Sequence, residues 1–187
     1  VATVLGTLVA FALGRHRFRG RSGTNLLIFM PMATPEVVMG SSLLTLFVMA
    51  GIPSGAVNIT IAHIMFCLSF VVVAVKARVS SLDPRLEEAA ADLGANALQT
   101  FVRVTLPLAA PGIAAGALLA FSLSFDDYII TNFNASPSSI TFPMYVWGAA
   151  QRGTPVEIFV VGTVMFLIAL TIVILGQVLS SRRDRKA

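Results

Sequence analysis

Charged residues are scarce in this chain. Asp, Glu, Lys and Arg make up 12% of its 187 residues, whereas soluble globular domains contain about 25%. Hydrophobic residues make up 56%, and the mean hydropathy is +0.86. So few charges cannot cover a water-facing surface. The composition therefore excludes an ordinary soluble domain and indicates that a lipid bilayer is the solvent.

Cysteine and histidine are also rare, with one cysteine and two histidines. A single cysteine, Cys67, can form neither a disulfide within the chain nor a cysteine-based metal site. His63 lies one helical turn from Cys67, but two ligands do not make a metal site. The sequence contains no G-x-x-x-x-G-K-[ST] phosphate loop and no H-E-x-x-H zinc motif. We therefore expect this chain to hydrolyse no ATP and to bind no metal or cofactor of its own.

The apolar residues gather in five segments, at about 1–14, 25–50, 57–75, 108–130 and 156–179. The last four reach the roughly 20 residues that a helix needs to cross a bilayer. The first would span only about 21 Å as a helix, so we expect it to begin upstream of Val1. No basic stretch typical of a cleavable signal peptide precedes it. The pattern predicts an all-α, polytopic transmembrane bundle forming one domain over 1–187, incomplete at its N-terminus.

The basic residues lie in alternate connections between these segments. Twelve of the 13 Lys and Arg residues lie near 15–21, 76–103 and 182–186, and only Arg152 lies elsewhere. Cytoplasmic loops carry the excess of Lys and Arg in membrane proteins. We therefore expect these connections and the C-terminus to be cytoplasmic, and we read the net charge of +4 as a sign of membrane orientation and not of nucleic-acid binding.

The two opposite connections differ in length. We expect residues 51–55 to form a tight turn, because Gly and Pro residues are typical of chain reversals. The longer connection, about 131–154, contains Tyr145 and Trp147, which suit a membrane interface. Thr154 is the expected N-cap of the last helix, followed by Pro155 and Glu157.

A polar, helix-forming insert occupies about 80–107, between the third and fourth segments. Asp83 and Pro84 predict a helix start, and Gly94 predicts its left-handed end. Asn96 and Gln99 resemble a capping box that opens a second short helix through Val104, before Pro107 leads into the next span. These helix signals alone fit two interpretations equally well: a structured docking surface, and a simple amphipathic linker lying on lipid.

The insert contains Glu-Ala-Ala at 88–90, then Gly94 after three residues, and Val-x-Leu-Pro at 104–107 after nine more. This spacing resembles the EAA motif of the membrane subunits of ABC-type importers. The resemblance implies a type I importer permease (MetI-like) fold. It also implies that the insert is the coupling helix that docks on a separate ATPase. The coupling residues it implies are Glu88, Ala89, Ala90, Asp92, Gly94, Leu106 and Pro107.

Three further stretches, RHRFRGR at 15–21, MATPEVVMGSSLLTLF at 32–47 and LSFDDYIITNF at 123–133, look like the spermidine/putrescine importer permeases. The resemblance implies a bacterial cytoplasmic-membrane protein. Its implied partners are a second permease subunit, two ATPase subunits that bind ATP and Mg, and an external solute-binding protein.

Glu36 lies near the middle of its apolar segment, about 17 Å along a helix from Asn25. A carboxylate at that depth is costly, so it should face a cavity or a partner. Pro31 and Pro35 should break the helix, and broken helices at that depth line water-filled paths. The alternative is a buried acid that is paired with a basic group or protonated.

Asp126 and Asp127 lie toward the outer end of the fourth segment, beside Phe125 and Tyr128. Carboxylates pair with the ammonium groups of a polyamine, and aromatic faces attract cations by about 0.5–2 kcal/mol. The alternative places both aspartates at the solvated interface, Asp127 more so than Asp126. The family resemblance favours Glu36 and Asp126 as contacts of the transported solute.

Two other classes of protein share some of these features. A gradient-driven secondary transporter would have acids within the membrane but needs no docking insert, and a scaffold subunit would explain the insert but not the acids. The interpretation as a permease for another cationic or small polar solute also stays open.

Small residues at helical spacing predict close helix packing. They are Ala2, Gly6, Ala10 and Gly14, and Gly112, Gly116 and Ala120.

Overall fold

The structure, a computed structural model, describes residues 1–16, 18–153 and 155–184, without the side chains of residues 173 and 175–184. All regular secondary structure in these residues is helical, which confirms the all-α prediction. The chain divides into two compact units, Val1–Ile140 and Thr141–Ala187, which are described separately. The single domain expected over the whole chain stays a prediction.

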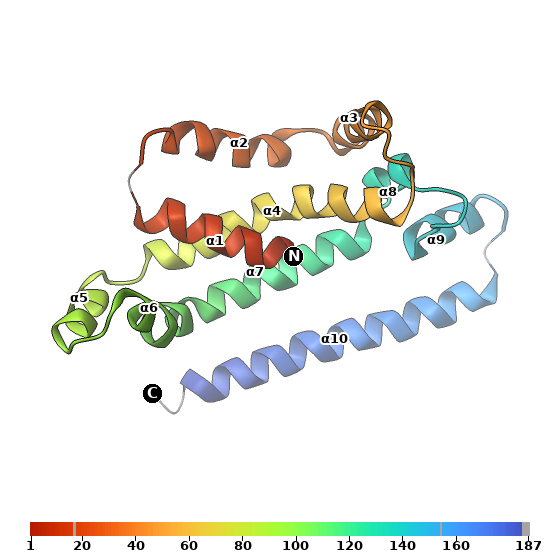
Figure 1. Cartoon of the computed structure of the whole chain (residues 1–187). Helices are drawn as coiled ribbons and strands as arrows, with labels where there is room; N and C mark the ends of the chain where they lie inside the picture. The colour runs from red at the N-terminus through yellow and green to blue at the C-terminus, as the bar shows by residue number, and fades with distance from the viewer. Residues whose placement is uncertain (17, 154, 185–187) are drawn as a thin grey trace. The chain divides into compact units, whose positions relative to one another are not determined.

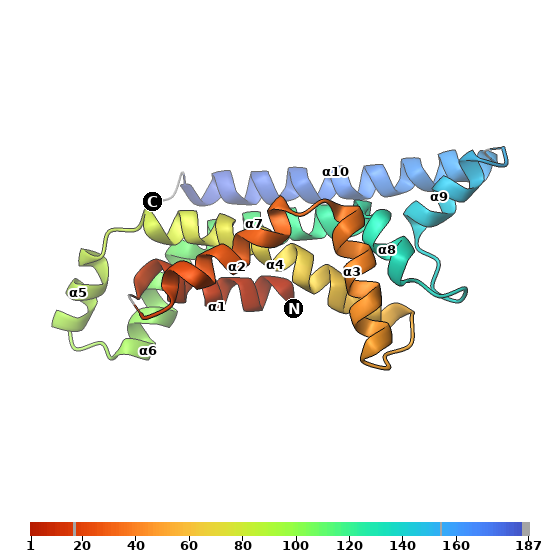
Figure 2. The same ribbon diagram turned by 90° about the horizontal axis from the view of Figure 1, so that it is seen from above.

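The described residues of the first unit form nine helical elements in sequence order, and α4 lies at their centre (Figures 1 and 2). α4 packs along α1 and α7 and also contacts α2, α3 and α8. Its buried residues include Val71, Val72, Val75 and Val79, each at most 1% exposed. The elements are α1 (Ala2–Arg15), α2 (Arg21–Ala33), α3 (Glu36–Met49), α4 (Ala56–Ser80), α5 (Arg85–Asp92), α6 (Ala97–Thr100), the π-helical turn η1 (Phe101–Thr105), α7 (Leu106–Asp126) and α8 (Ile129–Asn134).

Two of these helical runs are long and apolar enough to cross a bilayer by length and composition, namely α4 and the run Ala97–Asp126. A third crossing is possible if α2 and α3 together form one broken span. Helices that are apolar on all sides are typical of a protein core or of a membrane span. The composition and these helices together support the predicted membrane protein.

Glycine lets both α1 and α7 approach α4 closely. A Cβ atom added to Gly6 of α1 would lie 2.7 Å from Cγ1 of Val71, and one added to Gly14 would lie 2.9 Å from Cγ1 of Val79. On α7, a Cβ at Gly112 would collide with the Arg78 side chain. Small residues therefore permit this packing, as predicted from their helical spacing.

The second apolar segment is not a straight helix. α2 and α3 meet at an angle of 110° across a break of fewer than five residues, which confirms the predicted break. Pro31 lies inside α2, and Pro35 is the N-cap of α3. Glu36 is therefore the first residue of α3, directly after the break, because Pro35 cannot continue α2. Gly51 and Gly55, in the predicted turn after α3, have positive φ.

The insert begins as the sequence predicts. The Asp83 carboxylate accepts a hydrogen bond from the Arg85 backbone N–H at 3.0 Å, and α5 starts at Arg85. Gly94 has φ of +84°, the left-handed conformation expected after a helix end. Asn96 and Gln99 form the predicted capping box.

The second helix of the insert is longer than predicted. It does not end at Val104 but continues through η1 into α7, so Ala97–Asp126 is one run of 30 residues. In η1 the Leu106 N–H bonds to the Phe101 carbonyl five residues back. Local π-helical turns allow a membrane helix to continue past a proline, which explains why Pro107 causes no break.

The fourth segment ends earlier than predicted. α7 stops at Asp126, Asp127 is extended, and α8 begins at Ile129. The Asp127 carboxylate accepts hydrogen bonds from the backbone N–H groups of Ile130 and Thr131. An aspartate that binds the free N–H groups of the next turn stabilises a new helix start, and this ends α7.

The second unit contains α9 (Phe142–Ala150) and α10 (Val156–Asp184). α9 carries the exposed side chains of Tyr145 and Trp147, and the sequence analysis did not predict this helix. Glu157 lies in the first turn of α10 as expected. The predicted N-cap, Thr154, lies outside the described residues.

Candidate functional site

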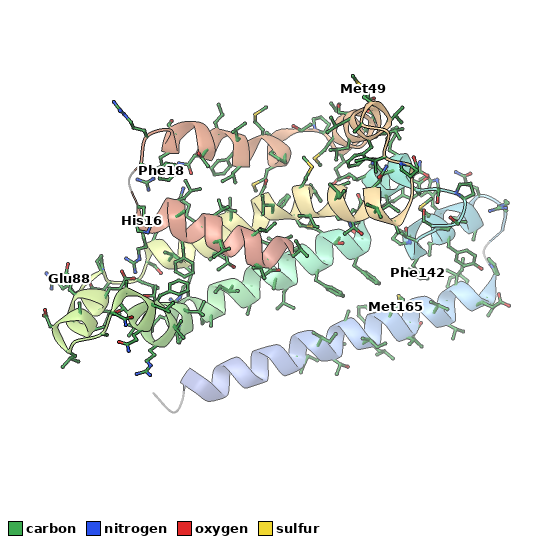
Figure 3. The ribbon with its side chains drawn as sticks, viewed as in Figure 1. His16, Phe18, Met49, Glu88, Phe142 and Met165 are labelled. Atoms are coloured by element: carbon green, nitrogen blue, oxygen red, sulfur yellow. The ribbon has the colours of Figure 1, made fainter. Side chains whose placement is uncertain are left out.

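The insert presents most of the predicted coupling residues to solvent. Glu88, Ala89, Asp92, Gly94 and Pro107 are exposed, and Ala90 and Leu106 are half-buried. Figure 3 shows Glu88 on the insert, at the same end of the first unit as His16 and opposite to Met49. An exposed carboxylate at this position is free to meet a partner protein.

Two leucines that are not part of the EAA spacing extend this surface. Leu93 is 90% exposed and Leu98 is 71% exposed, on either side of the Gly94 turn. Exposed apolar side chains that are rimmed by polar residues are typical of protein–protein contact sites. The sequence alone could not show that these two side chains are uncovered, because burial depends on the folded neighbours.

The adjacent acidic residue, Glu87, points in another direction. Its Oε1 lies 3.1 Å from Nη2 of Arg15 and accepts a hydrogen bond from Oγ1 of Thr105 at 3.0 Å. The insert is therefore held to the end of α1 and to the π-helical turn. The EAA spacing identifies Glu88, and nothing in it distinguishes Glu87 as an internal contact.

A polar cluster connects α4, α7 and α8 at the other end of the first unit. Nδ1 of His63 lies 2.7 Å from Oγ of Ser124. Nε2 of His63 lies 2.8 Å from Oγ1 of Thr131 and 3.2 Å from Oδ2 of Asp127. We call His63, Ser124, Asp127 and Thr131 the histidine cluster.

The hydrogen bonds in the histidine cluster determine where its protons lie. The Thr131 hydroxyl donates to Oδ2 of Asp127 at 2.6 Å, so its oxygen can only accept from His63. Nε2 of His63 therefore carries a proton. Nδ1 accepts from the Ser124 hydroxyl when the ring is neutral and donates to it when the ring is charged.

Asp127 is buried, with 8% of its surface exposed, whereas Asp126 is exposed. The expectation that Asp127 is the more solvated of the two is therefore wrong. Four hydrogen bonds from three residues hold the Asp127 carboxylate, and a buried carboxylate without them would be costly. Solute contact by Asp127 stays a prediction; the observed bonds fix the junction between α7 and α8.

The exposed end of α7 combines an acid with aromatic rings. Asp126 follows Phe125, which stacks on Phe121 with 5.7 Å between the ring centroids. Phe121 and Phe125 are 54% and 43% exposed. They lie four residues apart on one side of the helix, so Phe121 shares an exposed face with Phe125, and the sequence analysis did not single it out. Tyr128, the N-cap of α8, is half-buried.

Glu36 is exposed at the start of α3, one turn before the residue at which α3 meets α8. A Cβ added at Gly40 would lie 2.9 Å from the Phe133 ring, and Nδ2 of Asn134 donates to the Gly40 carbonyl at 3.4 Å. The fold therefore brings α3, which begins with Glu36, against α8, which follows the two aspartates. Among the described residues, no group of three or more His, Cys, Asp or Glu side chains could hold a metal ion.

Residues 2–186 match the family described as binding-protein-dependent transport system inner membrane component. The chain belongs to this family. The family has the MetI-like permease fold of ABC importers, as the EAA resemblance implied. The helical bundle and its long apolar helices fit an inner membrane component of this family.

Several relatives of the chain are permeases of polyamine transport systems. The spermidine/putrescine transport system permease protein PotC of Escherichia coli K12 is 39% identical over 184 residues, which cover 98% of this chain and 69% of the relative. The PotC protein of Haemophilus influenzae is 35% identical over 98% of this chain and 72% of the relative. The putrescine transport system permease protein PotI of E. coli K12 is 42% identical over 88% of this chain and 61% of the relative.

Proposed function

We propose that this chain is the permease subunit through which an ATP-driven importer moves polyamines across the bacterial cytoplasmic membrane. The main support is the similarity to polyamine permeases over nearly the whole chain. The chain works with a second permease subunit, two ATPase subunits and an external solute-binding protein. ATP and Mg bind to the ATPase subunits, and this chain hydrolyses no ATP.

The insert and the C-terminus face the cytoplasm in this proposal. The basic residues support it, because all of them except Arg152 lie in connections on one side of the predicted spans. The exposed end of α7, with Asp126, then faces the external side.

The exposed surface of the insert docks on an ATPase subunit. Leu93 and Leu98 supply apolar area, and Glu88 and Asp92 supply negative charge that pairs with basic groups of the partner. Burying exposed leucine side chains favours association by roughly 25 cal/mol per Å² of apolar surface. Closure of the ATPase dimer moves the insert and the helices attached to it.

Asp126, Phe125 and Glu36 contact the polyamine. A polyamine combines ammonium groups, which carboxylates bind, with an alkyl chain, which aromatic rings cover. Asp127 and Tyr128 also contribute to this polyamine site, at the start of α8, which the histidine cluster holds in position. Alternating access exposes this region first to the binding protein and then to the cytoplasm.

The test is transport by the whole complex in proteoliposomes. The chain is reconstituted with its partner permease, ATPase and binding protein, and uptake of labelled putrescine and spermidine is measured with ATP inside the vesicles. We expect uptake that needs ATP and is competed by unlabelled polyamine. Uptake of another cation or polar solute in preference would reject the polyamine assignment, and uptake by this chain alone in an ion gradient would reject the importer.

A further inference from the structure

One carboxylate oxygen joins three separate helical elements at the insert. Oε1 of Glu87, in the first turn of α5, lies 3.1 Å from Nη2 of Arg15, the last residue of α1. The same oxygen accepts the hydroxyl hydrogen of Thr105, the last residue of η1, at 3.0 Å. Glu87 therefore links the insert to α1 and to the base of α7.

A second contact joins α1 to the same region. The Phe11 ring meets the Phe101 ring edge to face, with 5.1 Å between centroids and 73° between planes. Phe11 lies four residues before Arg15, so both side chains lie on the same side of α1. Phe101 begins η1, and Thr105 ends it. α1 thus packs on the π-helical turn through the Phe11–Phe101 contact. It binds the insert through the ion pair between Arg15 and Glu87.

The burial of this ion pair separates it from an ordinary surface pair. The Arg15 side chain is 17% exposed and the Glu87 side chain is 33% exposed. Fully exposed pairs contribute little because water screens the charges. A partly buried pair that also binds a hydroxyl resists separation, since loss of one partner leaves the other charge poorly solvated.

The chain connects the insert differently to its neighbouring helices. α6 continues into α7 as one helical run, Ala97–Asp126, so α7 must follow any movement of α6. By contrast, no short stretch of chain connects the insert to α1. The contact of Glu87 with Arg15 and the contact of Phe101 with Phe11 supply that connection.

We propose that Glu87 is a positioning residue of the transport cycle, which makes α1 move together with the insert, while Glu88 faces the ATPase. This inference rests on the proposed function, since it requires that an ATPase moves the insert. Without the Glu87 contact, α5 can move at the Gly94 turn without carrying α1. ATP is then hydrolysed with little solute transport.

The experiment measures putrescine taken up per ATP hydrolysed by the whole complex in proteoliposomes, and the ATPase retained when the complex is purified in detergent. We expect Glu87→Gln and Arg15→Gln each to lower the transport ratio by about fivefold or more, with the ATPase still bound. The double variant should fall no further than either single variant, because both remove the same contact. Glu157→Gln, the same chemical change in the first turn of α10, should leave the ratio unchanged.

Exchange of the two charges provides the stricter test. Arg15→Glu combined with Glu87→Arg should recover much of the ratio that either single reversal loses, which a loss of fold would not allow. The inference is overturned by an unchanged ratio in Glu87→Gln, by additive losses in the double variant, or by loss of the ATPase from Glu87→Gln. If the unaltered complex takes up no putrescine with ATP, the proposed function fails, and this inference fails with it.

Discussion

Nε2 of His63 lies 3.2 Å from Oδ2 of Asp127, although 64 residues separate them in the sequence. The contact holds α4 against the junction of α7 and α8. Because the same carboxylate binds the first N–H groups of α8, the direction of α8 depends on this pair. The exposed residue beside it, Asp126, is the last residue of α7 and lies directly before this junction.

Loss of the Asp127 carboxylate should destabilise the protein. Asp127→Ala leaves His63, Thr131 and two backbone N–H groups without their acceptor, and each buried polar group without a partner costs about 1–3 kcal/mol. We expect a lower thermal unfolding temperature for the purified protein in detergent. Asp126→Ala is the matched control, since Asp126 is exposed, and an equal shift in both variants would contradict the assigned role of Asp127.

Asp126→Asn should reduce polyamine uptake without affecting assembly. The change removes a negative charge but keeps the size of the side chain, and a hydrogen bond to a charged group contributes about 1.5–3 kcal/mol. We therefore expect roughly a tenfold loss of uptake at low polyamine concentration, measured in proteoliposomes. Asp126→Glu keeps the charge and should retain part of the uptake. Normal uptake by Asp126→Asn would remove this residue from the polyamine site.

Glu88→Lys and Gly94→Asp should uncouple ATP hydrolysis from transport. Glu88→Lys reverses the charge of an exposed residue on the docking surface. Gly94 has φ of +84°, where an aspartate is strained. Both variants should bind less ATPase during purification and transport less putrescine.

Gly20→Asp tests whether strain alone causes the effect. Gly20 also has positive φ, +93°, and has open space around it. It lies between α1 and α2, outside the insert. If Gly20→Asp uncouples the complex as strongly as Gly94→Asp, the effect of Gly94→Asp is not specific to the insert.

Gly112→Ala should weaken the packing of α7 on α4. The new Cβ would meet Cβ and Cγ of Arg78, atoms near the backbone that cannot move away without moving the side chain. The Arg78 Nε–H donates to the Leu108 carbonyl at 3.0 Å, so a shift also disturbs this bond. Overpacking of this kind costs about 1–3 kcal/mol.

The measurement is the thermal unfolding temperature in detergent, which should fall for Gly112→Ala. Gly23→Ala in α2 is the matched control, because a Cβ at Gly23 meets nothing within 4 Å. Alanine favours a helix more than glycine does, so this control should be neutral or stabilising. A stable Gly112→Ala variant would show that α4 and α7 can separate at no cost.

The features that the sequence predicted correctly are set by neighbouring residues. Asn96 and Gln99 form their capping box within one helical turn, and Gly94 adopts the left-handed conformation that glycine allows most easily. Pro35 separates α2 from α3 because its ring cannot continue the preceding helix. The family match likewise agrees with a motif whose residues lie close together in the sequence.

The features that the sequence did not reveal depend on distant contacts. Asp127 is buried because His63 and Thr131 satisfy its carboxylate, and local composition suggested a solvated interface. Glu87 and Glu88 are identical in type and adjacent, yet only the folded position of Arg15 distinguishes them. The angle of 110° between α2 and α3 is also set by packing against α4 and α8 and not by the prolines alone.

The helical run Ala97–Asp126 continues from the insert to the acid at the far end of the bundle. It turns between α6 and α7 (Figure 2), and its straight part is α7, the 21 residues Leu106–Asp126. A helix of this length extends about 32 Å, so a swing of about 10° around one end displaces the other end by about 5 Å. The axis of α7 alone can therefore carry a displacement from the base of the insert to Asp126, without a relay of side chains in between.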